Sequence, residues 1–179
     1  MEAVLDQIIA FLESHQSWAP YLAFLFAFAE TLAFISIVIP STAILVGVGG
    51  LVATGALTLF PIWVGAAIGA VCGSMLSFWL GHRYGAKMLE GWPFDRHPGM
   101  VARGTHAFQK WGPAAIFIGH FFGPLRSVVF VLAGASRMSW WPFVLANTPG
   151  ALIWAYAIPK SGEIGGSVVG HLWRSFFGS

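Results

Sequence analysis

Two ionisable side chains interrupt long apolar stretches of the sequence, and they are the first candidates for chemistry. Glu30 is the tenth residue of the apolar segment 21–39, and Arg126 lies within the apolar segment 111–136. A charge at the centre of a membrane helix costs about 2.5–3.5 kcal/mol on insertion scales, so such residues face a cavity or a partner. We therefore expect both side chains to line a site inside the membrane.

The two charges suggest anion binding under the control of a carboxylate. Guanidinium stays protonated and binds phosphate or carboxylate through a bidentate fork, so Arg126 is a candidate phosphate ligand. Burial favours the protonated form of a carboxylate, so Glu30 is a candidate for proton coupling or gating. Structural roles stay open: a Glu30 hydrogen-bonded to a neighbouring helix, a buried ion pair, or an Arg126 that snorkels to the surface. The roles can also alternate, with Glu30 holding Arg126 until phosphate displaces it.

Prolines place helix breaks beside these charges. Pro40 and Pro124 each remove a backbone hydrogen bond, and non-helical backbone at membrane depth survives only inside protein or beside water. Ser41, Thr42 and His120 are the polar residues next to the breaks. We expect these three side chains to donate hydrogen bonds to an anion in one hydrated cavity. Alternatively, the hydroxyls repair backbone hydrogen bonds, and His120 is a buried structural histidine.

No catalytic residue, metal site or cofactor is expected. The sequence lacks a phosphate-binding P-loop, a Gly-x-Ser-x-Gly nucleophile turn and a His-Glu-x-x-His zinc helix. Glu30 is the single carboxylate at membrane depth, which is too few for a two-metal centre. Cys72 is the single cysteine, and we expect it to be a small buried apolar residue. The sequence therefore favours a protein that is not an enzyme.

The composition requires a membrane around these residues. Charged residues make up 9% of the 179 and hydrophobic residues 57%, and residues 31–81 contain no Asp, Glu, Lys, Arg or His. A soluble domain carries about 25% charge, and a membrane helix needs about 20 apolar residues. These values exclude a soluble enzyme, a disordered chain and a nucleic-acid-binding protein. They predict an all-α integral membrane protein whose residues 1–179 form a single membrane domain.

The predicted domain combines apolar segments with amphipathic and polar ones. The apolar segments cover residues 21–39, 43–60, 62–81, 111–136 and 140–159, and we expect an amphipathic interfacial helix at 1–18 and an interfacial tail at 161–179. Segment 83–110 carries five Lys or Arg against two Asp or Glu. Short cation-rich loops stay in the cytoplasm, so we expect 83–110 to be a basic cytoplasmic loop of a multi-pass protein.

Proline and glycine spacings suggest an internal repeat. Pro40 and Gly50 precede Pro124 and Gly134 by 84 residues. A second set is offset by 81 residues, since Pro61, Gly69 and Gly81 precede Pro142, Gly150 and Gly162. We expect repeat 1 at 20–82 and repeat 2 at 111–160. If each repeat is a re-entrant broken-helix hairpin followed by one full span, the second copy is inverted relative to the first.

A different layout makes 21–39 and 43–60 two complete spans, because 19 residues at about 1.5 Å each can cross a bilayer. Length alone does not decide between the two layouts. Gly65, Gly69 and Gly73 recur every four residues, and this spacing predicts a close helix-packing face.

The second half of the chain resembles a known family. The pattern begins with Gly119-His120-Phe-Phe-Gly-Pro124-Leu-Arg126 and continues with Ala133, Gly134, Met138, Phe143, Asn147, Gly150 and Trp154. The first half fits the same pattern, with Glu30 before Pro40 and with Gly73 before Gly81-His-Arg-Tyr-Gly85. Over about residues 20–160 the sequence resembles the DedA family of bacterial membrane proteins, which shares the VTT domain with eukaryotic lipid scramblases. The resemblance implies two re-entrant helices that face each other, flanked by transmembrane and amphipathic helices.

The resemblance also implies lipid movement across the bacterial cytoplasmic membrane, including return of the undecaprenyl phosphate carrier in some members, and dependence on the proton gradient. The family's functional glutamate falls on Glu30, and its proline-flanked arginine pair falls on His120 and Arg126. Three positions depart from the pattern: Thr42 and Ser74 replace acidic residues, and His120 replaces an arginine. The site keeps one carboxylate and one permanent cation, which is compatible with a divergent subfamily that takes another phospholipid.

These observations predict a lipid translocase that moves undecaprenyl phosphate or a phospholipid across the cytoplasmic membrane, with proton coupling. Its partners are then membrane lipids and their phosphate headgroup, with no nucleic acid, and the sequence leaves a homo-oligomer open. The alternatives are a nonselective phospholipid scramblase, a proton-coupled ion transporter and a non-transporting assembly partner.

Overall fold

The computed structural model describes residues 16–32, 41–53, 55, 57–91, 94–123 and 125–177, and within these ranges the chain is helical and contains no strand. The predicted all-α class is therefore confirmed. The elements are η1 (Gln16–Trp18), α2 (Ala19–Thr31), α3 (Ser41–Ala53), α4 (Leu59–Tyr84), η2 (Ala86–Glu90), η3 (Phe94–Arg96), α5 (Pro98–Trp111), α6 (Pro113–Gly119), α7 (Leu125–Ala135) and α8 (Trp140–Phe177).

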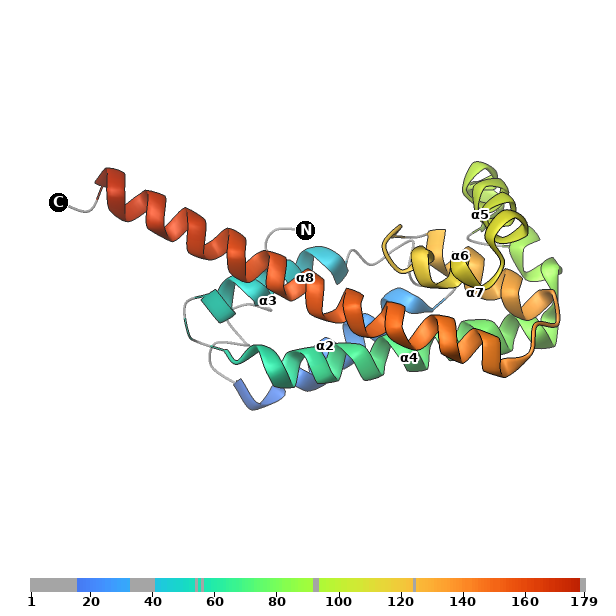
Figure 1. The fold of residues 1–179 in the computed structure, drawn as a ribbon, viewed down its shortest axis with the longest axis horizontal. Coiled ribbons are helices and arrows are strands. Elements are labelled where there is room, and N and C mark those ends of the chain that lie inside the picture. The colour runs from blue at the N-terminus through green and yellow to red at the C-terminus, as the bar shows by residue number, and fades with distance from the viewer. Residues whose placement is uncertain are drawn as a thin grey trace.

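Helices α4 and α8 run along the long axis of the molecule; α2, α3, α6 and α7 pack against them, and α5 packs on α6 and α7 (Figure 1). One core joins α2 and α3 to α4 and α8, and a second core joins α6 and α7 to the same two helices. Among the described helices, α4 has the length and apolar composition needed to cross a membrane. Its 26 residues span about 39 Å at 1.5 Å per residue, which exceeds a hydrocarbon core of about 30 Å.

Helix α2 covers only the first part of the apolar segment 21–39. It ends at Thr31, because Leu32 is extended, with φ −71° and ψ 134°. The Thr31 hydroxyl donates to the carbonyls of Ala27 and Phe28, which satisfies backbone acceptors in the last turn. Helices α2 and α3 have 13 residues each, about 20 Å of helix. Residues 21–39 therefore do not form one continuous helix.

Helix α2 lies close to α4 because glycines line the contact, as the four-residue spacing predicts. A Cβ atom at Gly65, Gly69 or Gly73 would collide with the backbone carbonyls of α2, and these are the carbonyls of Pro20, Phe24 and Phe28. Small residues at such spacing let two helix backbones approach. The contact places the end of α2, with Glu30, against the middle of α4.

Two further helix contacts follow one common pattern. Where α4 packs on α7, a Cβ at Gly81 would collide with the Val131 carbonyl, and a Cβ at Gly134 with the Phe78 carbonyl. Where α8 packs on α3, a Cβ at Gly162 would collide with the Val46 carbonyl, and a Cβ at Gly49 with the Pro159 carbonyl. The α3 residues precede their α7 counterparts by 85 residues, and the α4 residues precede their α8 counterparts by 81. Gly50, expected as the counterpart of Gly134, has an open space where a Cβ would lie, so the pairing is shifted by one residue.

Several expected boundaries differ from those in the structure. Most of the described part of 83–110 is helical rather than a loop, and α5 is its longest element. Helix α8 passes through residue 160 without interruption, so the expected tail is its continuation, with Pro149 and Pro159 inside the helix. Cys72 is exposed rather than buried, because it lies on a face of α4 that no described helix covers. The expected helix at 1–18 lies outside the described residues, apart from 16–18.

Candidate anion site

Arg126 and Glu30 form an ion pair inside the protein. The guanidinium Nη2 contacts Glu30 Oε1, and the two side chains are 0% and 6% exposed. Glu30 lies in the last turn of α2 and Arg126 in the first turn of α7. The structure therefore brings together the two charges that the sequence singles out. It excludes the alternative in which Arg126 snorkels to the surface.

The guanidinium also lies over an aromatic ring of α8. Arg126 Cζ is 4.5 Å from the centroid of Trp154, a distance typical of a cation–π contact. Within the described part of the chain, Nε and Nη1 of Arg126 are buried and have no hydrogen-bond partner. Buried donors are almost always hydrogen-bonded in folded proteins. Arg126 therefore keeps donor capacity for a further anionic group.

His120 lies in the turn after α6 and is completely buried. Its Nε2 is 2.9 Å from Asn147 Oδ1, and its ring centroid is 5.0 Å from that of Phe130. Because the amide oxygen only accepts, a neutral His120 uses its single N–H on Asn147, and Nδ1 is left as an acceptor. The predicted donation from His120 to phosphate therefore needs a protonated ring or a rotated one.

One face of α8 carries the residues that contact His120 and Arg126. Asn147, Gly150 and Trp154 follow each other at spacings of three and four residues, which places them on one side of a helix. A Cβ at Gly150 would lie 2.6 Å from the His120 ring and 3.1 Å from the Phe117 carbonyl, so glycine makes room for the histidine. The sequence shows the polar Asn147 in an apolar segment, but it does not single out Trp154 as a contact of Arg126.

Helix α4 fixes the end of α2 that carries Glu30. Ser77 donates to the Thr31 carbonyl at 2.8 Å, and both residues are buried. This carbonyl is one of the acceptors that a helix end leaves without an intrahelical partner. Ser74 is also buried, and its hydroxyl donates to the Val71 carbonyl at 2.9 Å. Sequence analysis missed Ser77, because a serine in an apolar span is common in membrane helix packing.

The remaining predicted site residues cannot be placed around the ion pair. Ser41 and Thr42 begin α3, but their side chains lie outside the described part, as do Pro40 and Pro124. One interruption does occur where a proline predicts it, at Pro124, whereas α2 already ends at Thr31, nine residues before Pro40. Helix α6 ends at Gly119, Gly123 has φ +45°, and α7 begins at Leu125. Among the described residues, no group of three metal-ligating side chains is present.

Fold and site define an all-helical membrane protein with a buried carboxylate–guanidinium pair. Residues 39–163 match the family model of the VTT domain, so the chain belongs to the VTT domain family, the DedA family of membrane proteins. It is 31% identical over 155 residues to inner membrane protein YabI of Escherichia coli K12, covering 86% of this chain and 59% of that protein.

Other relatives have names that give no activity. An uncharacterized membrane protein of Mycobacterium tuberculosis H37Rv is 36% identical over 127 residues, covering 68% of this chain and 58% of its own length. An uncharacterized membrane protein of Synechocystis is 33% identical over 125 residues, covering 65% and 55%. The chain thus spans less than two thirds of the length of these relatives. No solved structure matches the chain.

Proposed function

We propose that this protein moves a phosphate-bearing lipid across the bacterial cytoplasmic membrane, with Arg126 binding the phosphate and Glu30 acting as its exchangeable counter-ion. The observation that carries the proposal is the buried ion pair, in which Arg126 has two further nitrogens without partners in the described part of the chain. The lipid tail stays in the bilayer, and only the headgroup passes the site. A phosphate is thus spared the cost of entering hydrocarbon.

The two helix ends add to the electrostatics of the proposed site. A helix has partial positive charge at its N-terminus and partial negative charge at its C-terminus. Arg126 lies at the positive end of α7 and Glu30 at the negative end of α2, so each charge depends on the other for compensation. An arriving phosphate gains from both the guanidinium and the end of α7. A proton on Glu30 releases the guanidinium, which couples binding to protonation.

The proposed architecture has two inverted repeats, α2–α3–α4 and α6–α7–α8. Three features support it: the matching glycine contacts between α3 and α8 and between α7 and α4, the short paired helices, and the two corresponding cores. In transporters of this type, broken helices meet near the membrane midplane and create the substrate site. The α2–α3 and α6–α7 pairs are then re-entrant hairpins, and the site lies where α2 ends and α7 begins.

Reconstitution into liposomes tests the proposal. We expect the purified protein to accelerate transbilayer movement of a polyprenyl phosphate or of a fluorescent phospholipid, and we expect Arg126→Ala to abolish it. Because a lone buried charge destabilises a fold, Glu30→Leu/Arg126→Met is the second variant; replacing a buried pair by apolar residues preserves folding in other proteins. Lys160→Met is the control, because it removes a cation whose partner Glu163 lies outside the site.

The outcomes separate the candidate functions. Movement of both lipids at equal rates would indicate a nonselective scramblase, and ion flux without lipid would indicate a proton-coupled ion transporter. A folded Glu30→Leu/Arg126→Met protein that transports lipid at the wild-type rate would overturn the proposal.

A further inference from the structure

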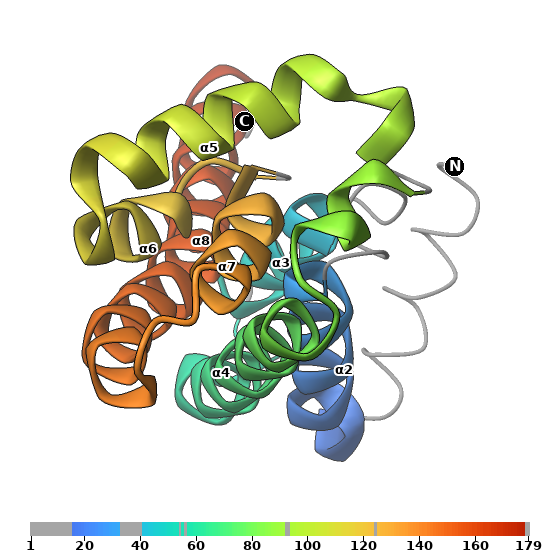
Figure 2. The ribbon, with the colours of Figure 1, turned by 90° about the vertical axis from the view of Figure 1, so that its right-hand side faces the viewer.

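Helix α5 lies across one end of the bundle. Figure 2 shows α4 end-on, with α5 crossing over α6 and α7. Its buried residue is Gly104, where a Cβ would lie 2.6 Å from Val128 Cγ1 of α7. Its exposed residues include Arg103, His106, Gln109 and Lys110. If α4 crosses the bilayer, α5 lies parallel to the membrane surface, as amphipathic interfacial helices do.

An apolar cavity of about 190 Å³ opens beneath this helix. Ala107 and Trp111 of α5, Ala115 and Ile118 of α6, and Leu125 and Val129 of α7 are among the residues that line it. None of these side chains except the Trp111 indole can hydrogen-bond to water. An enclosed apolar cavity of about 150 Å³ can stay dry and bind an apolar ligand such as benzene. The chemistry of the walls therefore fits a hydrocarbon chain.

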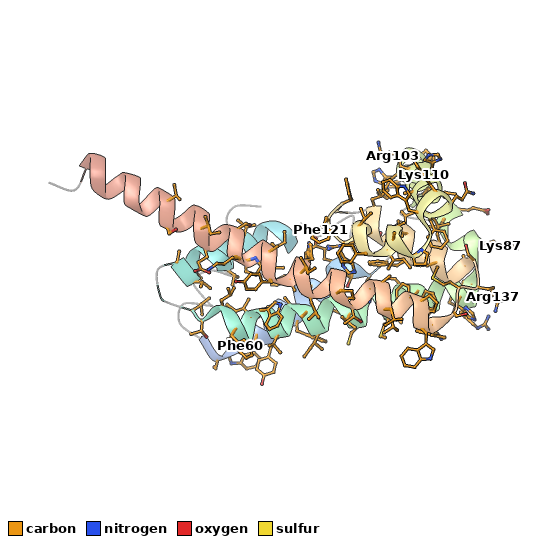
Figure 3. All side chains as sticks on the ribbon, in the orientation of Figure 1. Phe60, Lys87, Arg103, Lys110, Phe121 and Arg137 are labelled. Carbon is orange, nitrogen blue, oxygen red and sulfur yellow. The ribbon has the colours of Figure 1, made fainter. Side chains whose placement is uncertain are left out.

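The rim of the cavity carries positive charge. Lys110 Nζ lies 5.6 Å from the centroid of the Trp111 ring, and Trp111 is itself part of the wall. Helix α5 contains Arg103 and Lys110 and no acidic residue. Figure 3 shows Lys87, Arg103, Lys110 and Arg137 together at this end of the molecule. An occupant with an apolar tail and an anionic head complements both the cavity and its rim.

We propose that this cavity binds an anionic membrane phospholipid, with one acyl chain between α5 and the α6–α7 pair and its phosphate at Lys110. The site is distinct from the candidate anion site, because Arg126 is completely buried and faces Glu30 and Trp154, whereas Leu125 faces the cavity. The bound lipid fills the space beside Ala107 and Trp111 and holds α5 on the bundle. This inference is independent of the transport proposal.

Photo-crosslinking tests the site directly. The protein is reconstituted into phosphatidylcholine vesicles that contain a minor fraction of phosphatidylglycerol and a trace of phosphatidylglycerol with a diazirine on its acyl chain. Crosslinks are located by mass spectrometry of peptides. We expect labelling within residues 107–129, and unlabelled phosphatidylglycerol should reduce it where added phosphatidylcholine does not.

Two pairs of variants separate the tail from the headgroup. Ala107→Phe fills the cavity and should reduce labelling about tenfold, the effect of losing one to two buried methylenes, whereas Ala102→Phe, on the exposed face of α5, should leave it unchanged. Lys110→Gln should reduce phosphatidylglycerol labelling about fivefold, the effect of one cation at an anionic surface, and Arg103→Gln should have a smaller effect. Equal labelling by a phosphatidylcholine probe, or labelling that Ala107→Phe does not change, would overturn the proposal.

Discussion

At the scale of single residues, the Glu30–Arg126 pair is held by neighbours that sequence reasoning could not assign. A charge inside an apolar segment is conspicuous because it is costly there, and this made both partners predictable. Trp154 is different, because tryptophan in a membrane protein serves equally in packing, in interfacial positioning and in cation–π contacts. Its role under the guanidinium at 4.5 Å emerges only from the tertiary contact.

The buried pair makes a prediction about stability. Glu30→Leu or Arg126→Met alone leaves one uncompensated charge, and each should cost about 3–5 kcal/mol of unfolding free energy, whereas the double variant should lie close to the wild type. Thermal or denaturant unfolding in detergent micelles measures the three values, with Lys160→Met as a control of small effect because that ion pair is partly exposed. Additive losses in the double variant would contradict a direct pairing.

At the scale of helices, one break and one packing face could be predicted, and the packing register could not. Pro124 marks the break between α6 and α7, and the four-residue glycine spacing marks the face between α2 and α4. Proline alone is not a sufficient signal, because α8 continues through Pro149 and Pro159. Gly49 and Gly50 are adjacent, however, and a spacing pattern cannot decide which of them faces another helix. The structure puts Gly49 against α8 and leaves Gly50 facing open space. The exposure of Cys72 could not be predicted either, because a lipid-facing surface is as apolar as the interior.

This difference between neighbouring glycines gives a second prediction. Gly49→Ala places a methyl group against the Pro159 carbonyl and should destabilise the protein by about 1–3 kcal/mol, as overpacking of a close contact does. Gly50→Ala meets nothing within 4 Å and should be neutral or stabilise by up to about 1 kcal/mol, because alanine is the better helix former. Unfolding of the two variants in the same detergent provides the comparison. Equal effects at both positions would show that the α3–α8 contact has another register.

At the scale of the whole molecule, charge is distributed unequally along the long axis. Lys87, Arg103, Lys110 and Arg137 lie at the end where α5 crosses the bundle, and Phe60 lies in the other half (Figure 3). Exposed aromatic residues lie at both ends: Trp18, Tyr21 and Phe60 near the start of α4, and Tyr84, Trp140 and Trp141 near its end. Cation-rich segments remain cytoplasmic during membrane insertion. We therefore expect α5 on the cytoplasmic side and the start of α4 on the opposite side.

This orientation leads to the last prediction, which concerns the two ends of α4. With Cys72 replaced by serine, single cysteines at Thr58 and Lys87 report on opposite ends of a helix of about 39 Å, and both positions are exposed. A membrane-impermeant thiol reagent applied to intact spheroplasts should label Thr58→Cys and spare Lys87→Cys, which reacts only after the membrane is permeabilised. Labelling of Lys87→Cys alone would reverse the orientation, and labelling of both from outside would show that α4 does not cross the membrane. The crossing matters for the candidate anion site, because the end of α2, with Glu30, packs against the middle of α4. Only if α4 spans the membrane does Glu30 lie at the depth of the hydrocarbon core.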